Sequence, residues 1–158
     1  MNKLVMLLLA ATLAAPACSK KPKPDESGLA SAANADENIG DSDRGNAMGL
    51  QSINFGYDAY VLDGKAKEIL KANSQILKDK ASAKIQVEGH CDQRGGIQYN
   101  VALGEKRANS VKKFLVEQGV SADRISVISF GKEKLLDQGT TEEAYARNRR
   151  ANFVVTAR

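Results

Sequence analysis

The segment VEGHCDQRGGIQYNVALGEKRA, Val87–Ala108, joins a strand pattern to a helix pattern through a polar loop. Residues 83–89 (AKIQVEG) alternate apolar and polar side chains, which is typical of a half-buried strand. From about Tyr99 to Gln118 apolar residues recur at helical spacing, and Gly119 follows where a left-handed cap would end the helix. The segment therefore predicts a strand–loop–helix unit whose polar groups gather in the loop.

The same alternation of strands and helices continues on both sides of this unit. Asp63 stands where an N-cap would start a helix. The other predicted elements are strands at 52–57 (SINFGY), 124–131 (RISVISFG) and 151–157 (ANFVVTA), a helix over 63–77 and a short helix or turn at 141–150 (TEEAYARNRR). Within one domain at 51–158 this pattern predicts an α+β fold, a two-layer sandwich with helices on one face of a small mixed sheet.

Residues 1–17 have the features of a secretory signal peptide, with Lys3, an apolar run and small residues at the end. The apolar run is shorter than the roughly 20 residues that a membrane-spanning helix needs. Cys18 directly follows APA and resembles the lipidated cysteine of bacterial lipoproteins, although APA also fits an ordinary A-x-A cleavage site. Ser19 resembles the residue that directs such lipoproteins to the cell outer membrane. We therefore expect a lipid-anchored protein whose domain faces the periplasm.

Residues 18–50 are rich in Ser, Asn, Asp and Gly and contain almost no large apolar side chain. Such a composition buries too little apolar surface to offset the entropy lost on ordering. We expect a flexible tether over 18–50 that carries a folded domain over 51–158.

Composition narrows the possible partners. The chain is 42% hydrophobic and 27% charged, with a formal net charge of +4. A modest positive charge suits an anionic partner. Export and the scattered positions of the basic residues argue against nucleic acid, and nothing in the sequence indicates a cofactor.

The loop of the opening segment contains the only histidine, yet it lacks the partners that catalysis would need. His90, Cys91 and Asp92 are immediate neighbours, and neighbours on an extended chain point to opposite sides, so they do not form a zinc site. Glycoside hydrolysis would need two carboxylates across a cleft, and Glu88 and Asp92 do not provide them. We expect a non-enzymatic loop in which the His90 ring is hydrogen-bonded to nearby backbone and Cys91 is a small buried thiol.

Asp92 and Arg107 are the remaining candidates for a site. Gly95 and Gly96 allow the loop to turn back, and Arg107 lies about two turns inside the helix, from where its side chain can return toward the strand end. One anion and one bidentate cation around a shared pocket suit a zwitterion such as the end of an amino acid. The alternative is a plain Asp92–Arg107 salt bridge that joins the loop to the helix.

Several blocks then carry a resemblance that covers Ile53–Val155. GHCDQRGG, YNVALGEKRANSV and the late NRR match, in order and spacing, the OmpA-like peptidoglycan-binding domain family, and in particular the peptidoglycan-associated lipoproteins of the Tol–Pal system. The resemblance implies a βαβαβ-type fold and non-covalent binding of peptidoglycan through the zwitterionic end of stem-peptide diaminopimelate.

The resemblance also implies a set of binding residues and a protein partner. Asp92 and Arg107 would hold the ligand, and backbone amides after the first strand would contribute. The implied contacts beyond that pair are Phe55, Gly56, Tyr57, Asn100, Leu103, Arg149 and Arg150, of which the last four line or support the pocket. The implied partner is the periplasmic protein TolB, in a role in envelope integrity and cell division. The alternative is a wall-anchoring lipoprotein without TolB.

Overall fold

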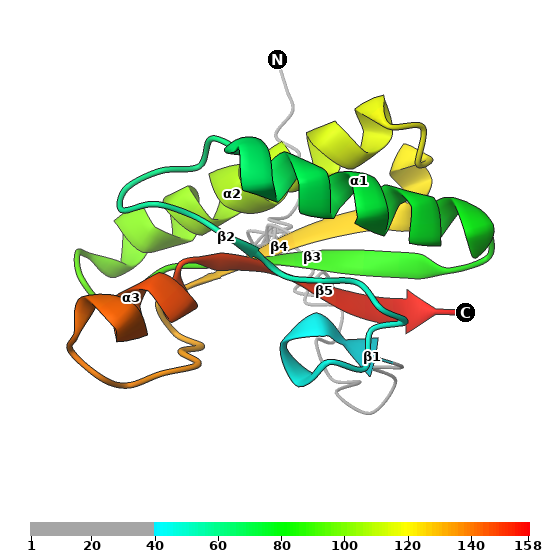
Figure 1. Ribbon diagram of the computed structural model, residues 1–158. Coiled ribbons are helices and arrows are strands. Elements are labelled where there is room, and N and C mark those ends of the chain that lie inside the picture. The colour runs from blue at the N-terminus through cyan, green and yellow to red at the C-terminus, as the bar shows by residue number, and fades with distance from the viewer. Residues whose placement is uncertain (1–39) are drawn as a thin grey trace, which may run out of the picture. The chain divides into compact units, whose positions relative to one another are not determined.

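The computed structural model describes residues 40–158 (Figure 1). The predicted signal peptide, the lipidation of Cys18 and the tether as far as residue 39 lie outside the described residues. Within residues 40–158, no helix is both long and apolar enough to cross a membrane.

The sheet is mixed, in agreement with the prediction, and has five strands, of which β1 was not predicted. Its order is β1-β5-β3-β4, and β2 also pairs with β5. β3 and β4 are parallel, whereas β5 is antiparallel to β3 on one side and to β1 and β2 on the other. The strands are β1 (Gly40–Asp41), β2 (Ile53–Asn54), β3 (Lys84–His90), β4 (Ile125–Gly131) and β5 (Arg150–Ala157).

Two long helices cover one face of this sheet. α1 (Gly64–Asp79) and α2 (Ile97–Glu117) lie side by side on it, whereas α3 (Glu142–Asn148) lies beyond the end at which β5 begins (Figure 1). Two single turns of 3-10 helix, η1 (Ser42–Arg44) and η2 (Ala122–Arg124), complete the fold. The predicted two-layer α+β sandwich is confirmed, with α1 and α2 as its helical layer.

Local signals in the sequence account for the helix boundaries. The Asp63 carboxylate accepts a hydrogen bond from the Ala66 amide at 2.7 Å, so Asp63 is the N-cap of α1 as predicted. Gly119 has a φ of +93°, the left-handed conformation expected after the end of α2. α2 begins at Ile97, two residues earlier than predicted.

The core lies between the sheet and the two long helices. Its fully buried side chains come from the inward-facing positions of the strands and the apolar stripes of the helices, and they include Ile53, Leu70, Ile85, Val87, Val111, Leu115, Phe153 and Val155. Each large apolar side chain that is fully buried contributes about 1.5–3 kcal/mol. This packing fixes α2 against β3 and β4.

A glycine pair sets the distance between α2 and β3. A Cβ atom on Gly89 would lie 1.9 Å from the carbonyl oxygen of Gly104, which is a backbone atom that cannot move aside. The helix therefore crosses the strand with backbone against backbone. Arg107, one turn after Gly104, is held beside the end of β3 as a result.

The predicted boundary of the folded domain at residue 51 is wrong, because residues 40–50 are part of the fold. β1 pairs with the second half of β5, and the side chains of Ala47 and Leu50 belong to the core. The segment is also held by polar contacts, from Ser42 Oγ to Asn152 Oδ1 at 2.6 Å and from Arg150 Nε to Asp43 Oδ2 at 2.8 Å. Its few apolar residues suffice because β5 supplies partners for its polar groups.

Candidate functional site

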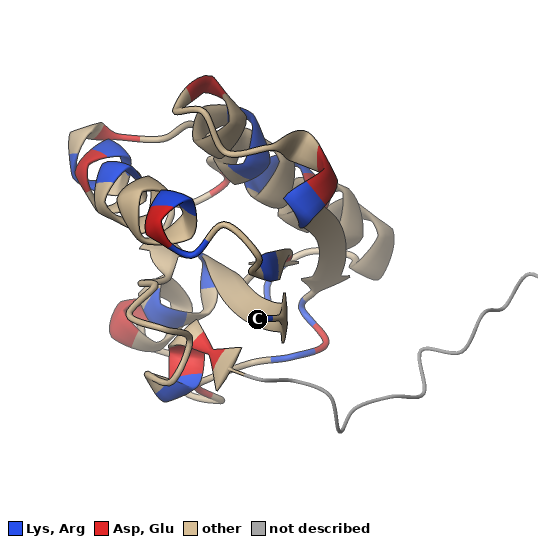
Figure 2. Cartoon of the chain, turned by 90° about the vertical axis from the view of Figure 1, so that its right-hand side faces the viewer, with Lys and Arg blue, Asp and Glu red and all other residues tan. Residues whose placement is uncertain are grey.

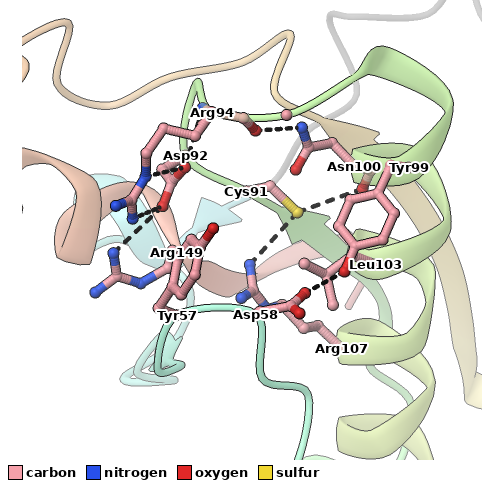
Figure 3. Close-up of a pocket in the computed structure, with 11 residues that line it drawn as sticks. Tyr57, Asp58, Cys91, Asp92, Arg94, Tyr99, Asn100, Leu103, Arg107 and Arg149 are labelled. Carbon is pink, nitrogen blue, oxygen red and sulfur yellow. Dashed lines mark hydrogen bonds and ion pairs between the residues drawn. The ribbon is translucent and has the colours of Figure 1, made fainter.

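A cavity of about 160 Å³ opens where the end of β3, the first turns of α2, the loop after β2 and the start of β5 meet (Figure 3). This volume is below the roughly 300–1,000 Å³ of pockets for drug-sized ligands, so it suits one small polar group. The lining residues are Tyr57, Asp58, Cys91, Asp92, Arg94, Gly95, Tyr99, Asn100, Leu103, Arg107 and Arg149.

Arg107 is a buried cation at the base of this cavity, with 1% of its surface exposed. Its guanidinium donates to the carbonyl oxygens of Ala59 at 2.7 Å, His90 at 2.9 Å and Gly56 at 3.1 Å. A further N–H contacts the Cys91 sulfur at 3.4 Å. Burial lowers the pKa of Arg107, but an arginine still stays protonated at physiological pH. Residues of the described part of the chain therefore engage four of its five N–H groups, and one of them is left to donate to a ligand.

Asp92 is the anion of the site and is 4% exposed. Burial alone would raise the pKa of Asp92, but hydrogen bonds from Arg94 and then Arg149 outweigh it and hold the pKa below its usual value. The carboxylate lies 2.6 Å from Arg94 Nη2 and 3.3 Å from Arg149 Nη1. Asp92 is therefore ionised at neutral pH.

The structure decides between the two readings of the Asp92–Arg107 pair. The ion pairs of Asp92 are with Arg94 and Arg149, and the guanidinium of Arg107 is held by backbone carbonyls and Cys91 (Figure 3). The alternative of a plain Asp92–Arg107 salt bridge is wrong. The two side chains instead present opposite charges to one cavity from different elements.

The two neighbouring arginines predicted for the site have separate positions. Arg149 lines the cavity and also donates to the Phe55 carbonyl at 3.1 Å and to the Glu142 carboxylate at 2.6 Å. Arg150 is not among the lining residues. Its side chain pairs with Asp43, so it holds the N-terminal segment and not the cavity. Arg149 is the residue that ends α3, whereas Arg150 is the first residue of β5, so the two side chains leave the chain from different elements.

Of the three backbone amides that the resemblance implies after β2, that of Phe55 is engaged within the protein, whereas the roles of those of Gly56 and Tyr57 stay a prediction. The Phe55 amide donates to the Arg149 carbonyl at 2.9 Å, so it is not available to a ligand. The carbonyls of Phe55 and Gly56 instead position Arg149 and Arg107, and the Phe55 ring lies 5.3 Å from the Arg107 guanidinium. Tyr57, which is 67% exposed, forms part of the cavity wall.

Two further predicted residues support the wall on the α2 side. Asn100 is buried, and its side-chain amide donates to the carbonyls of Arg94 at 2.7 Å and Gly96 at 3.1 Å. These bonds fix the loop that carries Asp92. Leu103, also buried, supplies an apolar part of the lining.

His90 and Cys91 have structural surroundings. The predicted hydrogen bond from the His90 ring to backbone is not found, since the ring stacks on Phe130 and neither ring nitrogen has a hydrogen-bond partner among residues 40–158. Its Nε2 lies 3.5 Å from the Glu88 carboxylate, a weak contact. Cys91 is a buried free thiol whose pKa is raised by burial. Across residues 40–158, no three His, Cys, Asp or Glu residues are close enough to hold a metal ion.

Arg94 is the main residue of the site that the sequence analysis missed. Its guanidinium forms a fork with both oxygens of Asp92 and lies between the rings of Tyr57 and Tyr145, 4.4 Å and 4.2 Å from their centroids. The Asp-x-Arg spacing was visible, because an Asp side chain commonly accepts from the amide two residues later. The aromatic partners come from distant parts of the chain and were not visible.

Comparisons with known proteins identify the family of the chain. The OmpA family model matches residues 54–149. A "Peptidoglycan-associated lipoprotein" of Pasteurella multocida is 42% identical over 63% of this chain and 67% of the relative. One of Legionella pneumophila is 36% identical over 98% of this chain and 95% of the relative.

A solved structure extends the likeness to three dimensions. The crystal structure of the peptidoglycan-associated lipoprotein from Burkholderia pseudomallei superposes with a TM-score of 0.64 at 36% identity, over 66% of this chain and 88% of that one. The chain belongs to the OmpA family and, within it, to the group of peptidoglycan-associated lipoproteins.

Proposed function

We propose that this protein is an outer-membrane lipoprotein that binds peptidoglycan non-covalently and links the outer membrane to the cell wall as part of the Tol–Pal system. Its ligand is the zwitterionic end of stem-peptide diaminopimelate. The observation that carries the proposal is the convergence of ionised Asp92 and ionised Arg107 on one small cavity without a salt bridge between them.

The charges of the site match the two ends of such a ligand. The ammonium group would lie at Asp92 and the carboxylate at Arg107, through the N–H that none of residues 40–158 engages. Both protein groups are almost fully buried, so their interaction with a ligand is screened less than on an open surface. The small volume of the cavity favours one end of an amino acid over a sugar ring.

The domain is a binding module and not an enzyme. Asp92 is held ionised by two arginines, which makes it a poor general acid. Cys91 is buried with a raised pKa, so it is a poor nucleophile. Both groups favour retention of a ligand over its conversion.

The surface charge fits a wall ligand better than nucleic acid. Figure 2 shows segments of Lys and Arg interspersed with segments of Asp and Glu along the helices. A protein that follows a phosphate backbone concentrates its cations on one face or along one groove. The cations here act locally, as at the Asp92 cavity.

Sedimentation with purified sacculi that contain diaminopimelate tests the proposal. The wild type is expected to sediment, and Asp92→Asn and Arg107→Lys are expected to stay in solution. Asp92→Asn conserves side-chain size, Arg107→Lys conserves the positive charge but not the guanidinium, and Asp79→Asn on the exposed surface of α1 is the matched control. Circular dichroism establishes that each variant is folded. Wild type that remains in solution would refute peptidoglycan binding, and a folded Asp92→Asn that sediments like wild type would refute the role of the pair.

Membrane anchoring and the protein partner are separate parts of the proposal. We place the lipid on Cys18, which mass spectrometry of the mature protein would detect. We assign TolB as the partner on the resemblance of the site loop and α2, and expect a muropeptide to compete with it. An alternative is an anchor without TolB, which a failed pull-down of TolB by the ligand-free protein would support.

A further inference from the structure

The carboxylate of Asp92 is fully occupied by donors of the domain itself. Its Oδ1 accepts from the Arg94 amide and from Arg94 Nε, both at 3.1 Å. Its Oδ2 accepts from Arg94 Nη2 at 2.6 Å and from Arg149 Nη1 at 3.3 Å. A carboxylate offers about four lone-pair positions, so four donors leave none for the ammonium group of a ligand.

Arg94 is the donor that can leave most easily. Its side chain is 36% exposed, whereas that of Arg149 is 7% exposed and is also held by Phe55 and Glu142. Arg94 Nη1 lies 3.7 Å from the second carboxylate oxygen of Glu142, whose side chain is 62% exposed. If the fork to Asp92 opens, the guanidinium keeps an anion within reach at the rim of the cavity.

We propose that Arg94 is a built-in competing cation, which occupies Asp92 in the free domain and must be displaced by the ammonium group of the ligand. This inference rests on the proposed function and concerns the same site. The exchange replaces one cation at Asp92 by another, so the buried carboxylate is never left without a positive partner. Leaving it unpaired would be costly, because a buried charge is stable only when it is paired.

The competing cation makes the site selective. A ligand end that has a carboxylate but no free ammonium group can contact Arg107 but has nothing to displace Arg94 with. A zwitterion satisfies both residues at once. The aromatic rings of Tyr57 and Tyr145 on either side of Arg94 hold its plane in register with the Asp92 oxygens, which a lysine at this position would not match.

The contact between Arg94 and Asp92 also reduces the affinity of the wild type for its ligand. The apparent dissociation constant equals the intrinsic one divided by the fraction of molecules in which the site is free. A partly exposed ion pair is worth about 0.2–1 kcal/mol, which keeps Arg94 on Asp92 in most molecules, so Arg94→Ala is expected to bind about two- to sixfold more tightly. If Arg94 merely positioned Asp92, its replacement by alanine would instead weaken binding of the ligand.

Calorimetric titration tests whether Arg94→Ala binds more tightly or more weakly than the wild type. The full chain in detergent micelles is titrated with a soluble muropeptide that carries free diaminopimelate, and with the same muropeptide after acetylation of its amine. Arg44→Ala is the matched control, because the Arg44 side chain is 77% exposed and lies outside the cavity. Tighter binding of the free-amine probe by Arg94→Ala, with Arg44→Ala like wild type and no binding of the acetylated probe by wild type, would establish the competing cation.

The outcomes separate this inference from the proposed function. Wild type that binds neither probe refutes peptidoglycan binding itself. Wild type that binds while Arg94→Ala binds equally or more weakly refutes only the competing cation. A second measurement, by NMR of the ¹⁵N-labelled protein, needs no variant. The Nε–H proton of Arg94 should be protected from exchange with water in the protein alone and should lose that protection when the protein is saturated with the free-amine probe. An Arg94 signal that stays protected in the saturated complex would overturn the inference.

Discussion

Removing the Asp43 carboxylate is expected to destabilise the domain strongly. Asp43 and Arg150 form a buried ion pair at 2.8 Å, with side chains only 9% and 5% exposed. In Asp43→Ala the Arg150 guanidinium would keep a bond to the Asn148 carbonyl at 3.3 Å but lose its only counter-ion among the described ion pairs. Breaking one partner of a buried pair typically costs about 3–5 kcal/mol. The variant would also lose the hydrogen bond from Ser52 Oγ to Asp43 at 2.8 Å.

Thermal unfolding followed by circular dichroism measures this effect. For a domain of this size, a loss of 3–5 kcal/mol lowers Tm by roughly 10–20 °C. Asp79→Ala, at an exposed position of α1, is the control and should leave Tm nearly unchanged. A double-mutant cycle with Arg150→Ala isolates the coupling between the two side chains, which should be large because they are in direct contact. An Asp43→Ala variant within about 0.5 kcal/mol of wild type would contradict the inclusion of residues 40–50 in the fold.

Three further outcomes are expected. Gly89→Ala should prevent or severely weaken folding, because its Cβ would lie 1.9 Å from the Gly104 carbonyl oxygen. Urea unfolding measures this loss of stability, and Gly64→Ala, at a position with open space around it, is the control. Asp92 has a lowered pKa, so it contributes stability above its unfolded pKa near 3.9, and that contribution is lost as pH falls through the lower folded pKa. A pH series of urea unfolding should therefore show a smaller acid-side loss of stability in Asp92→Asn than in wild type. The Cys91 thiol should react slowly with a thiol reagent in the native state and quickly in urea, since it is buried and its pKa is raised.

Elements with a strong hydrophobic period were predictable from the sequence. The period of 2 in β3 and the helical period of α1 and α2 reflect which side chains each element buries, and that information is local. The cap at Asp63 and the left-handed Gly119 are also local, because each is decided within a few residues. The short β1 and the 3-10 turn after it carry no such period, and the sequence analysis assigned them to a tether.

Part of the site was predictable, but the pairing within it was not. Asp92 and Arg107 were assigned by spacing and by family resemblance, and both line the cavity. Three arginines, Arg94, Arg107 and Arg149, were chemically equivalent candidates for the same carboxylate. Only the positions of α2 and β5 relative to the loop decide that Arg94 and Arg149 pair with Asp92, while backbone carbonyls hold Arg107.

The sequence by itself determined the fold class, the main helices and strands, and the family, because periodicity and motifs depend on residues close together in the chain. Tertiary structure alone decided the N-terminal limit of the domain and which charged side chains pair around the cavity. Ser42 and Asp43 meet Asn152 and Arg150 across more than a hundred residues. Such contacts depend on how the whole sheet is assembled, since a polar side chain is stable in a buried position only where a distant partner is brought to it.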